Sequence, residues 1–569
     1  MGTTAAASRR NRQLRAFGSL TGNRALLRVL VAYLLFTLAE YAVWIAMLVF
    51  AYSRGGTAVA ALVAVAQLVP AAVVAPVVAA VADRRSPVGL LAGGYLVQAT
   101  AMAGTAAAVS AGTPLAAYAG AVVAATAVTT TRPAQATLIP SVAATPDQLT
   151  AANVVAGWME AAGAAAAGLL AGVLISLAGV GSVFAVCAGL GLLAALLVAG
   201  RGWAGRAAPM AAAEQDAGAP AKASAAAGIG EGLRLAVRQP RLRLMLALLT
   251  ADAVVLGALD LLVVILALTV LGRSPGWAGY LQFAFAAGAL LAATVSAVLV
   301  GRRLGGPILA AALAFSIALA AIAFGPGLGG TVALLAVAGA GHSLLEVATR
   351  TLLQRSVPPQ LIGRIFGVLE GLMMAGLALG ALLVPALAHL GGSRLAVLGV
   401  AAVLPLAAVA GGRAVFRLDA GTAVPVVEIA LLRSLPLFAE LPAPAIEGLA
   451  AALRPVQLSA GAVLIRQGDP GDAYFAIAAG ELDAEQDGQF LGRYGRGDGV
   501  GEIALLRDVP RTATVTAHTA ATVYRLDRDL FLTAVLGHAP TQRQADRIAA
   551  ARLAAKAAPA HHDRPQAGR

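Results

Sequence analysis

The segment GEIALLRDVPRTATV, residues 501–515, places the carboxylate of Glu502 nine positions before the guanidinium of Arg511. An arginine fork matches two phosphate oxygens, which a lysine cannot do. The N–H groups at the start of a short helix can bind the same anion. A carboxylate beside a phosphate is repulsive unless it has a second partner, such as a sugar hydroxyl. The segment therefore predicts a pocket for a ligand that carries both a phosphate and a sugar hydroxyl.

Each polar group of this segment has an expected role. Arg511 would bind the phosphate, together with the N–H groups of Ile503 and Ala504 and with the hydroxyl and N–H of Thr512. Glu502 would accept a hydrogen bond from the sugar hydroxyl. A second interpretation stays open, in which these residues lie on a β-roll that binds nothing. The predicted pocket comprises Gly501, Glu502, Ile503, Ala504, Arg511, Thr512 and Ala513.

The pocket belongs to a C-terminal region, 431–557, whose pattern is typical of a soluble β-rich domain. Its apolar runs are short and are separated by Gly-Asp, Pro-Gly-Asp and Asp-Gly turns. Residues 540–557 predict a polar helix. Residues 558–569 predict a disordered tail, in which His561 and His562 are solvated and do not form a metal site.

The region before this domain has the composition of a membrane protein. In the whole chain of 569 residues, 59% are hydrophobic and only 12% are charged, and the mean hydropathy is +0.82. A soluble chain has about twice that charged fraction. The net charge of +13 does not predict nucleic-acid binding, because the basic residues fall in alternate loops between apolar runs. The single cysteine, Cys187, excludes a disulfide within the chain.

Twelve apolar runs are long enough to cross ~30 Å of hydrocarbon. They are 27–52, 57–82, 88–111, 114–131, 151–178, 180–200, 241–270, 275–301, 306–325, 329–350, 365–390 and 393–412. The expected domains are a basic cytoplasmic N-terminus (1–25), a six-helix bundle (26–200), a cytoplasmic linker (201–240), a second six-helix bundle (241–412), a linker (413–430), the β-rich domain (431–557) and the tail (558–569).

The distribution of arginines predicts the topology. One set of loops carries only Arg54, Arg273 and Arg394. By the positive-inside rule the other, basic set is cytoplasmic, and both termini lie in the cytoplasm of a plasma-membrane protein. The basic set comprises Arg84, Arg85, Arg132, Arg201, Arg206, Lys222, Arg234, Arg238, Arg241, Arg243, Arg302, Arg303, Arg350, Arg355 and Arg364.

The membrane region also repeats itself. Arg84-Arg85 recurs as Arg302-Arg303, and Thr131-Arg132 recurs as Thr349-Arg350, in both cases 218 positions later. Both pairs occupy matching places in the order of spans. Two six-span halves are the simplest account, and internal repeats are common in secondary transporters.

Carboxylates inside predicted spans are costly and usually functional. Asp252 and Asp260 lie about 80° apart around the seventh helix, so both could face one cavity. Glu346 and Arg350 are four residues apart, which predicts a structural ion pair, and His342 is one turn from Glu346. Glu370 also falls in a span. The candidates for transport or proton coupling are Asp252, Asp260, Glu160 and Glu40.

The membrane region, about 25–412, resembles the major facilitator superfamily. The resemblance rests on AVADRRSPVG after the second span, on VGRRLGG at 300–306, and on the small-residue run 151–172, which is similar to the fifth span of the drug- and siderophore-exporter branch. It implies a fold of twelve transmembrane helices in two six-helix pseudo-repeats. It also implies that Asp83, Arg84 and Arg85 form a loop motif that latches helices in one conformational state.

The C-terminal region, about 433–536, resembles the cyclic nucleotide-binding domain of catabolite-activator-like proteins, kinase regulatory subunits and gated channels. LPLFAELP, LIRQGDPGDAYFAIAAGEL, GDGVGEIALL and PRTATVTA follow the family pattern in order. The resemblance implies a cytoplasmic β-roll with flanking helices, and cAMP or cGMP as the regulatory ligand. Gly499-Val500 departs from the pattern, because the family usually has a larger residue before the Gly-Glu pair.

Together these features predict a secondary transporter, an exporter of small organic compounds, that is regulated by a cyclic nucleotide. The alternative is a membrane-anchored cyclic nucleotide receptor without transport activity. An enzyme is not expected, because the sequence has no P-loop, no G-x-S-x-G and no metal-ligand cluster. It also lacks the filter segment of a gated channel. The expected partners are the lipid bilayer, a small-molecule substrate and the nucleotide, with no cofactor; the substrate, the coupling ion and the oligomeric state are left open.

Overall fold

The computed structural model describes residues 22–82, 86–142, 146–199, 234, 239–295, 304–357, 359–421, 426–438, 441, 443–536, 541–548 and 550. The chain divides into two compact units. The larger comprises Met1–Leu299 with Arg303–Thr422, and the smaller comprises Ala423–Arg569 with Val300–Arg302.

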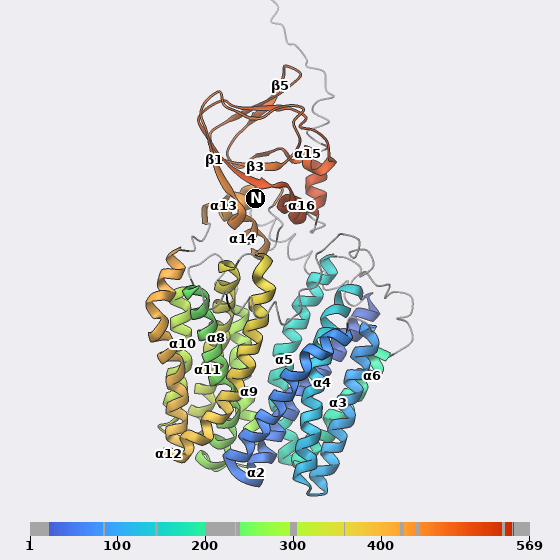
Figure 1. The fold of residues 1–569 in the computed structure, drawn as a ribbon, viewed down its shortest axis with the longest axis vertical. Coiled ribbons are helices and arrows are strands. Elements are labelled where there is room, and N and C mark those ends of the chain that lie inside the picture. Colours follow the sequence, from blue (N-terminus) through green and yellow to red (C-terminus); the bar gives the residue numbers. More distant parts are fainter. Residues whose placement is uncertain are drawn as a thin grey trace, which may run out of the picture. The chain divides into compact units, whose positions relative to one another are not determined.

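The larger unit is built of long helices that run side by side (Figure 1). In the N-terminal half they are α2 (Arg24–Ala82), α3 (Pro87–Ser110), α4 (Pro114–Val142), α5 (Pro146–Ala178) and α6 (Val180–Ala199). In the C-terminal half they are α8 (Pro240–Ile265), continued by the π-helical turn η2 (Leu266–Val270), then α9 (Trp277–Val295), α10 (Gly305–Ile322), α11 (Gly327–Ser356) and α12 (Pro359–Gly421).

Each half packs mainly on itself. In the first half α3 contacts α4 and α6, and α2 contacts α4, α5 and α6. In the second half α8 contacts α12, α11 contacts α9 and α10, and α10 contacts α12. The two halves meet where α5 packs on α9 and where α2 packs on α8 and α12. This is the arrangement of two bundles that the internal repeat predicts.

Nine segments of the described helices are long and apolar enough to cross a membrane. This makes the chain a multi-pass membrane protein. Two of the nine, Arg24–Pro70 and Ile365–Ala410, are 47 and 46 residues long, about twice the length that one crossing needs. Each contains a glycine pair with non-helical backbone angles, Gly55-Gly56 in α2 and Gly391-Gly392 in α12. The second glycine of each pair has a positive φ, which glycine adopts without steric cost.

Two helices extend beyond the ends that the sequence predicts. The fourth span was expected to end at 131 and the tenth at 350, but α4 continues to Val142 and α11 to Ser356. Arg132 and Arg350 therefore lie within helices, not in loops. Both pair with carboxylates of the bundle, Arg132 with Glu40 and Glu160 and Arg350 with Glu346.

The smaller unit begins with two short helices, α13 (Val426–Ser434) and α14 (Ala443–Ala452), followed by two antiparallel four-stranded sheets. The first sheet has the order β1 (Arg454–Leu458), β8 (Ala521–Asp527), β3 (Ala473–Ala479), β6 (Gly499–Val500). The second has the order β2 (Val463–Ile465), β7 (Thr514–Ala517), β4 (Leu482–Gln486), β5 (Gln489–Tyr494). Helices α15 (Glu502–Arg507) and α16 (Arg528–Leu536) interrupt and follow the strands, and residues 541–548 are helical.

Alternation along β3 creates two cores. Phe475 and Ile477 point between the sheets, where they pack with Val500, Val515 and Val523. Tyr474 and Ala476 point to the other face, where they pack against the flanking helices. Because successive strand residues face opposite sides, one strand supports both the helical cover and the interior of the roll. The predicted β-domain with flanking helices is confirmed.

Candidate functional site

The predicted phosphate pocket is assembled around the side chain of Arg511, which is 4% exposed. Its guanidinium donates to the main-chain oxygens of Gly501 (3.2 Å) and Ala473 (2.8 Å) and to Oδ1 of Asp472 (2.9 Å). Three of its five N–H donors are used in this way, which leaves two for a ligand. The ring of Phe475 lies 6.0 Å below the guanidinium carbon. The charge is thus fixed in place before any anion arrives.

Gly501 connects β6 to α15 and determines the shape of the pocket. Its φ is +97°, a conformation that L side chains rarely adopt. A Cβ at this position would lie 2.5 Å from Nη1 of Arg511. Only glycine therefore allows the chain to turn into α15 while Arg511 remains against the main chain.

Helix α15 brings the other predicted residues to the same place. Glu502 is its first residue and is buried, and the N–H groups of Ile503 and Ala504 belong to its first turn. Thr512 and Ala513 are half-buried and lie in the turn between Arg511 and β7. All seven predicted pocket residues therefore lie on α15 and on the two short turns that flank it.

Asp472 is a pocket residue that the sequence prediction missed. Its carboxylate joins Arg511 to a second arginine, Arg525 of β8, whose Nη2 lies 3.1 Å from Asp472 Oδ2. The hydrogen bonds that Arg525 donates to Asp527 and Asp472 raise its pKa above the ordinary value. Asp472 itself is 59% exposed, so water can solvate its carboxylate. The segment RQGDPGD contains this aspartate, but only the fold shows which of its acids reaches Arg511.

The atypical Gly499 has a steric cause. A Cβ at Gly499 would collide with the phenol of Tyr474, whose ring stacks on Phe531 (5.0 Å between centroids). Tyr474 therefore occupies the space that a larger residue at position 499 would fill. Gly499 thus makes room for the Tyr474 ring in the core.

The predicted intramembrane carboxylates lie in three separate polar clusters. Arg132 of α4 pairs with Glu40 of α2 (3.1 Å) and Glu160 of α5 (3.2 Å). Tyr33 donates a hydrogen bond to Glu160 (3.0 Å). We call these four residues the N-half cluster. Among the residues that the structure describes, no hydrogen bond or ion pair joins this cluster to Asp252 or Asp260.

Asp260 forms the second cluster. It accepts hydrogen bonds from Nε1 of Trp44 (3.0 Å) and from Nε2 of Gln282 (3.4 Å). Trp44 belongs to α2 and Asp260 to α8, so this bond joins the two halves of the membrane unit.

Asp252 forms the third cluster, on the side of α8 that faces α11. Its carboxylate lies 3.1 Å from Nδ1 of His342. The predicted ion pair of Glu346 with Arg350 is confirmed at 3.0 Å. His342, one turn from Glu346 as the sequence indicates, has its Nε2 3.8 Å from that carboxylate, and its bond to Asp252 was missed.

The predicted loop motif of Asp83, Arg84 and Arg85 lies outside the described residues.

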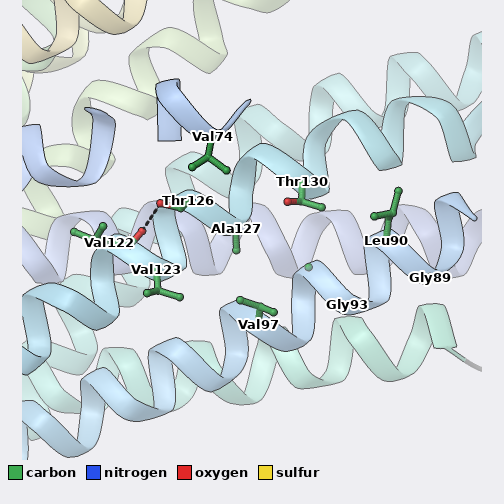
Figure 2. Close-up of a pocket in the computed structure, with 11 residues that line it drawn as sticks. Val74, Gly89, Leu90, Gly93, Val97, Val122, Val123, Thr126, Ala127 and Thr130 are labelled. Carbon is green, nitrogen blue, oxygen red and sulfur yellow. Dashed lines mark hydrogen bonds between the residues drawn. The ribbon is translucent and has the colours of Figure 1, made fainter. Parts of the chain in front are cut away.

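A hollow of about 450 Å³ lies between α2, α3 and α4 (Figure 2), and it is lined by small apolar residues such as Gly93, Val97 and Val123. The hydroxyl of Thr126 at its edge donates to Val122 O (2.8 Å), so its hydrogen is already used within the helix. Among the described residues that line it, this hollow offers no charged group.

A bundle of apolar helices in two halves, with ionisable residues inside it, is the architecture of a membrane transporter, and the β-roll with its buried arginine is that of a small-anion sensor. Comparison with family models agrees. The Major Facilitator Superfamily model matches residues 29–369, and the cyclic nucleotide-binding domain model matches residues 455–538. The chain belongs to the major facilitator superfamily, and a cyclic nucleotide-binding domain is fused to its C-terminal side. These two domain types are those of a non-enzymatic protein.

Relatives of the C-terminal domain are found among kinase subunits. The chain is 40% identical over 104 residues to a cAMP-dependent protein kinase regulatory subunit of Emericella nidulans, a match that covers 18% of this chain and 25% of the relative. It is 39% identical over 100 residues to an uncharacterized protein of Mycobacterium tuberculosis, which covers 18% and 20%. The chain thus spans only about a quarter of the length of these relatives.

Solved structures similar to the chain include the regulatory domain of Toxoplasma gondii PKA with cAMP. That match has 28% identity and a TM-score of 0.22, and it covers 25% of this chain and 56% of that structure.

Proposed function

We propose that the protein is a secondary transporter whose conformational equilibrium is biased by a cyclic nucleotide bound to its C-terminal domain. Family membership supports transport. The observation that carries the regulatory part is the buried Arg511 fork, with two N–H donors left for a ligand beside the first turn of α15. A nucleotide acts on transport only through unequal affinity for the transporter's states, and a coupling of ~1–3 kcal/mol would change transport several-fold to about a hundredfold.

Twelve spans are the count that best fits the helices. Dividing the two long candidates at Gly55-Gly56 and Gly391-Gly392 adds two spans to the nine. Helix α3, with 24 residues, has the length for one more. This gives six spans in each half, with the bundles at 26–200 and 241–412 as the sequence predicts.

The orientation follows from the arginines at one end of the bundle. Arg54, Arg273 and Arg394 lie at the turns of that end, and each stacks on an aromatic ring, Phe50, Trp277 and Phe324 respectively, at 5.1–5.7 Å. Aromatic residues are enriched at membrane interfaces. We assign this end to the outside of the plasma membrane, which places both termini and the nucleotide domain in the cytoplasm.

The contact between the halves supports a state that is closed on the outside. Near the outer end, Gly168 and Gly172 of α5 lie directly against Gly276 and Gly279 of α9, and a Cβ at Gly168 would lie 2.8 Å from Gly279 O. The N-half cluster lies further toward the cytoplasmic end and keeps Arg132 and Glu160 half-exposed. Rocking of the halves around this region would alternate access to a site near Glu40, Glu160, Asp252 and Asp260.

Cyclic AMP is the ligand we propose, because the relatives of this domain are cAMP-dependent kinase subunits. Cyclic GMP remains the competitor, since the hydroxyl of Thr512 suits either phosphate or guanine. Export of a small amphipathic compound is proposed from the similarity of the fifth span to exporters.

Two measurements on the full-length protein test the proposal. Calorimetry with cAMP and cGMP tests binding. Uptake of ethidium into inverted vesicles, with and without cAMP, tests export and regulation, with Asp260→Asn as the transport control. Uptake that changes with cAMP and is lost in the variant supports the proposal. Binding with no uptake above protein-free vesicles supports the receptor without transport.

A further inference from the structure

A second arginine, Arg525, lies on the face of the first sheet that points into the β-roll. Val523 and Phe475 both point between the two sheets. Arg525 follows Val523 by two positions on β8 and lies opposite Phe475 of β3, so its side chain leaves the sheet on the same face. The guanidinium of Arg511 lies over the ring of Phe475, at 6.0 Å. Arg525 and Arg511 are therefore neighbours on the pocket side of this sheet.

The carboxylate of Asp472 is shared between these two arginines. Its Oδ1 accepts a hydrogen bond from Nη2 of Arg511 (2.9 Å), and its Oδ2 lies 3.1 Å from Nη2 of Arg525. Arg525 is anchored on its other side, since its Nε donates to Oδ1 of Asp527 (3.0 Å). Each arginine therefore holds one oxygen of Asp472, and the four side chains together carry no net charge.

This geometry differs from the one that Asp472 would adopt with Arg511 alone. A guanidinium and a carboxylate form their strongest pair through two parallel hydrogen bonds. Three of the five N–H donors of Arg511 are already used, so a second bond to Asp472 would take one of the two that remain for a phosphate. Asp472 is 59% exposed, and its contact with Arg525 is what keeps the second oxygen away from Arg511.

The position of Arg511 itself does not depend on Asp472. The main-chain oxygens of Gly501 and Ala473 bind Nη1 and Nη2 of the guanidinium and hold it in place. What Asp472 affects is how many N–H donors of Arg511 stay free, and what Arg525 affects is the orientation of Asp472.

The strand on the other side of β8 supplies a comparison within the same sheet. Arg454 of β1 lies directly opposite Arg525 and is exposed. Among the described residues it forms no ion pair, so it does not bind Asp472. Arg454 and Arg525 therefore bring the same charge to neighbouring positions, but only Arg525 contacts the carboxylate beside the pocket.

We propose that Arg525 is a positioning residue of the nucleotide pocket, which holds Asp472 away from the Arg511 fork and so keeps the fork open to the phosphate. Arg525 acts through Asp472 and needs no contact with the ligand. Without Arg525, Asp472 would turn both oxygens to Arg511 and compete with the phosphate for the same donors. The inference rests on the proposed binding of a cyclic nucleotide and adds a residue, outside the segment 501–515, that sets its affinity.

A double-variant cycle tests this, with calorimetry of cAMP binding to the full-length protein. Arg525→Gln should weaken binding by about threefold to tenfold, between the effect of an exposed ion pair and that of a charge-assisted hydrogen bond. In protein that already carries Asp472→Asn, whose neutral amide is a weaker competitor, Arg525→Gln should change the affinity by less than about twofold. Arg454→Gln, the matched control, should bind as the wild type does.

Three results would overturn the proposal. The first is wild-type affinity in Arg525→Gln. The second is an equal loss with and without Asp472→Asn, which would mean that Arg525 acts on the ligand itself. The third is an equal loss in Arg454→Gln, which would mean that the general positive charge of the sheet is responsible.

The cycle also separates this inference from the proposed function. If Arg525→Gln does not fold, as judged by thermal unfolding, Arg525→Met, which keeps a long unbranched stem, replaces it in the same cycle. Absence of binding of both cAMP and cGMP to the wild type would refute the proposed regulation and this inference with it. Binding by the wild type without coupling between positions 472 and 525 would refute this inference alone.

Discussion

Two arginines, one in each unit, are held in opposite ways. Arg511 of the β-roll is 4% exposed and is held mainly by main-chain oxygens and by one exposed aspartate. Arg132 of the membrane unit is held by two carboxylates of neighbouring helices, Glu40 and Glu160. The first arrangement keeps a positive charge available for an outside anion, whereas the second neutralises the charge internally.

The difference predicts what is lost when each arginine is removed. Main-chain oxygens left by Arg511 carry no net charge, and Asp472 can turn to water. The carboxylates left by Arg132 keep their charges within a helix bundle. Removal of Arg511 should therefore abolish ligand binding, and removal of Arg132 should lower the stability of the fold.

The largest expected effect is on nucleotide binding. Arg511→Ala should weaken cAMP binding by about 10²–10⁴-fold, because two charge-assisted hydrogen bonds of ~1.5–3 kcal/mol each are lost. Arg511→Lys should recover only part of the affinity, since lysine lacks the fork. Calorimetry on the full-length protein measures both variants.

Arg507→Ala is the matched control, because Arg507 lies at the exposed end of the same helix, α15. It should bind as the wild type does. Equal affinities for Arg511→Ala and Arg507→Ala would show that the β-roll does not hold the phosphate at Arg511, and the contrast between the two arginines would disappear.

The second effect is on stability. Arg132→Gln should lower the free energy of unfolding by about 1–3 kcal/mol, less than a fully buried pair would lose because the N-half cluster is partly exposed. Adding Glu40→Gln should restore part of the loss by removing the unpaired charge. Thermal unfolding in detergent measures this, with Arg54→Gln as a control that removes only a ring contact. A loss as large in Arg54→Gln would contradict the role of the carboxylates.

Short sequence separations decide which contacts could be predicted. Gly501, Glu502 and Arg511 lie within eleven residues, so the sequence alone indicates that they lie close together around α15. Glu346 and Arg350 were predictable because four residues make one helical turn. Asp472 and Arg511 are 39 residues apart, and Asp252 and His342 are 90 apart. Such pairs depend on which helices or strands pack together, and local spacing carries no information about that.

The early end predicted for the fourth helix has a related cause. A lone arginine inside hydrocarbon is costly, and the predicted apolar run ends at Thr131, directly before Arg132. Glu40 lies 92 residues before Arg132 and pairs with it, so this charge is not alone where the helix continues. The prediction used only the residues next to Arg132, whereas the carboxylate that pairs with it comes from a distant part of the sequence.

The third prediction concerns the contact between the halves. Gly168→Ala should destabilise the closed outer contact by about 1–3 kcal/mol, because its Cβ would lie 2.7 Å from the main-chain nitrogen of Phe283. Gly157→Ala changes the same helix where nothing lies within 4 Å, and it should be neutral or slightly stabilising. The measurement is maleimide labelling of a cysteine introduced by Ala171→Cys, a buried position between Gly168 and Gly172, in protein that also carries Cys187→Ala. Labelling should become faster in Gly168→Ala and not in Gly157→Ala. An increase in both would mean that helix propensity, and not the contact, controls opening.

The smallest effect should occur at an arginine that is neither buried nor in a pocket. Arg493 on β5 hydrogen-bonds Asp483 on β4 (2.7 Å), and this bond, aided by His518, lowers the pKa of the Asp483 carboxyl. A carboxyl with a lowered pKa in the folded state stabilises the fold above its ordinary pKa of about 4, and that contribution is lost as the pH falls through the folded-state value. Arg493→Gln should raise the pKa of Asp483 toward its ordinary value, as measured by NMR titration of the carboxyl carbon. Arg496→Gln, at an exposed position three residues away, should leave it unchanged; if both variants shift it equally, the general field of the domain and not the paired guanidinium sets that pKa.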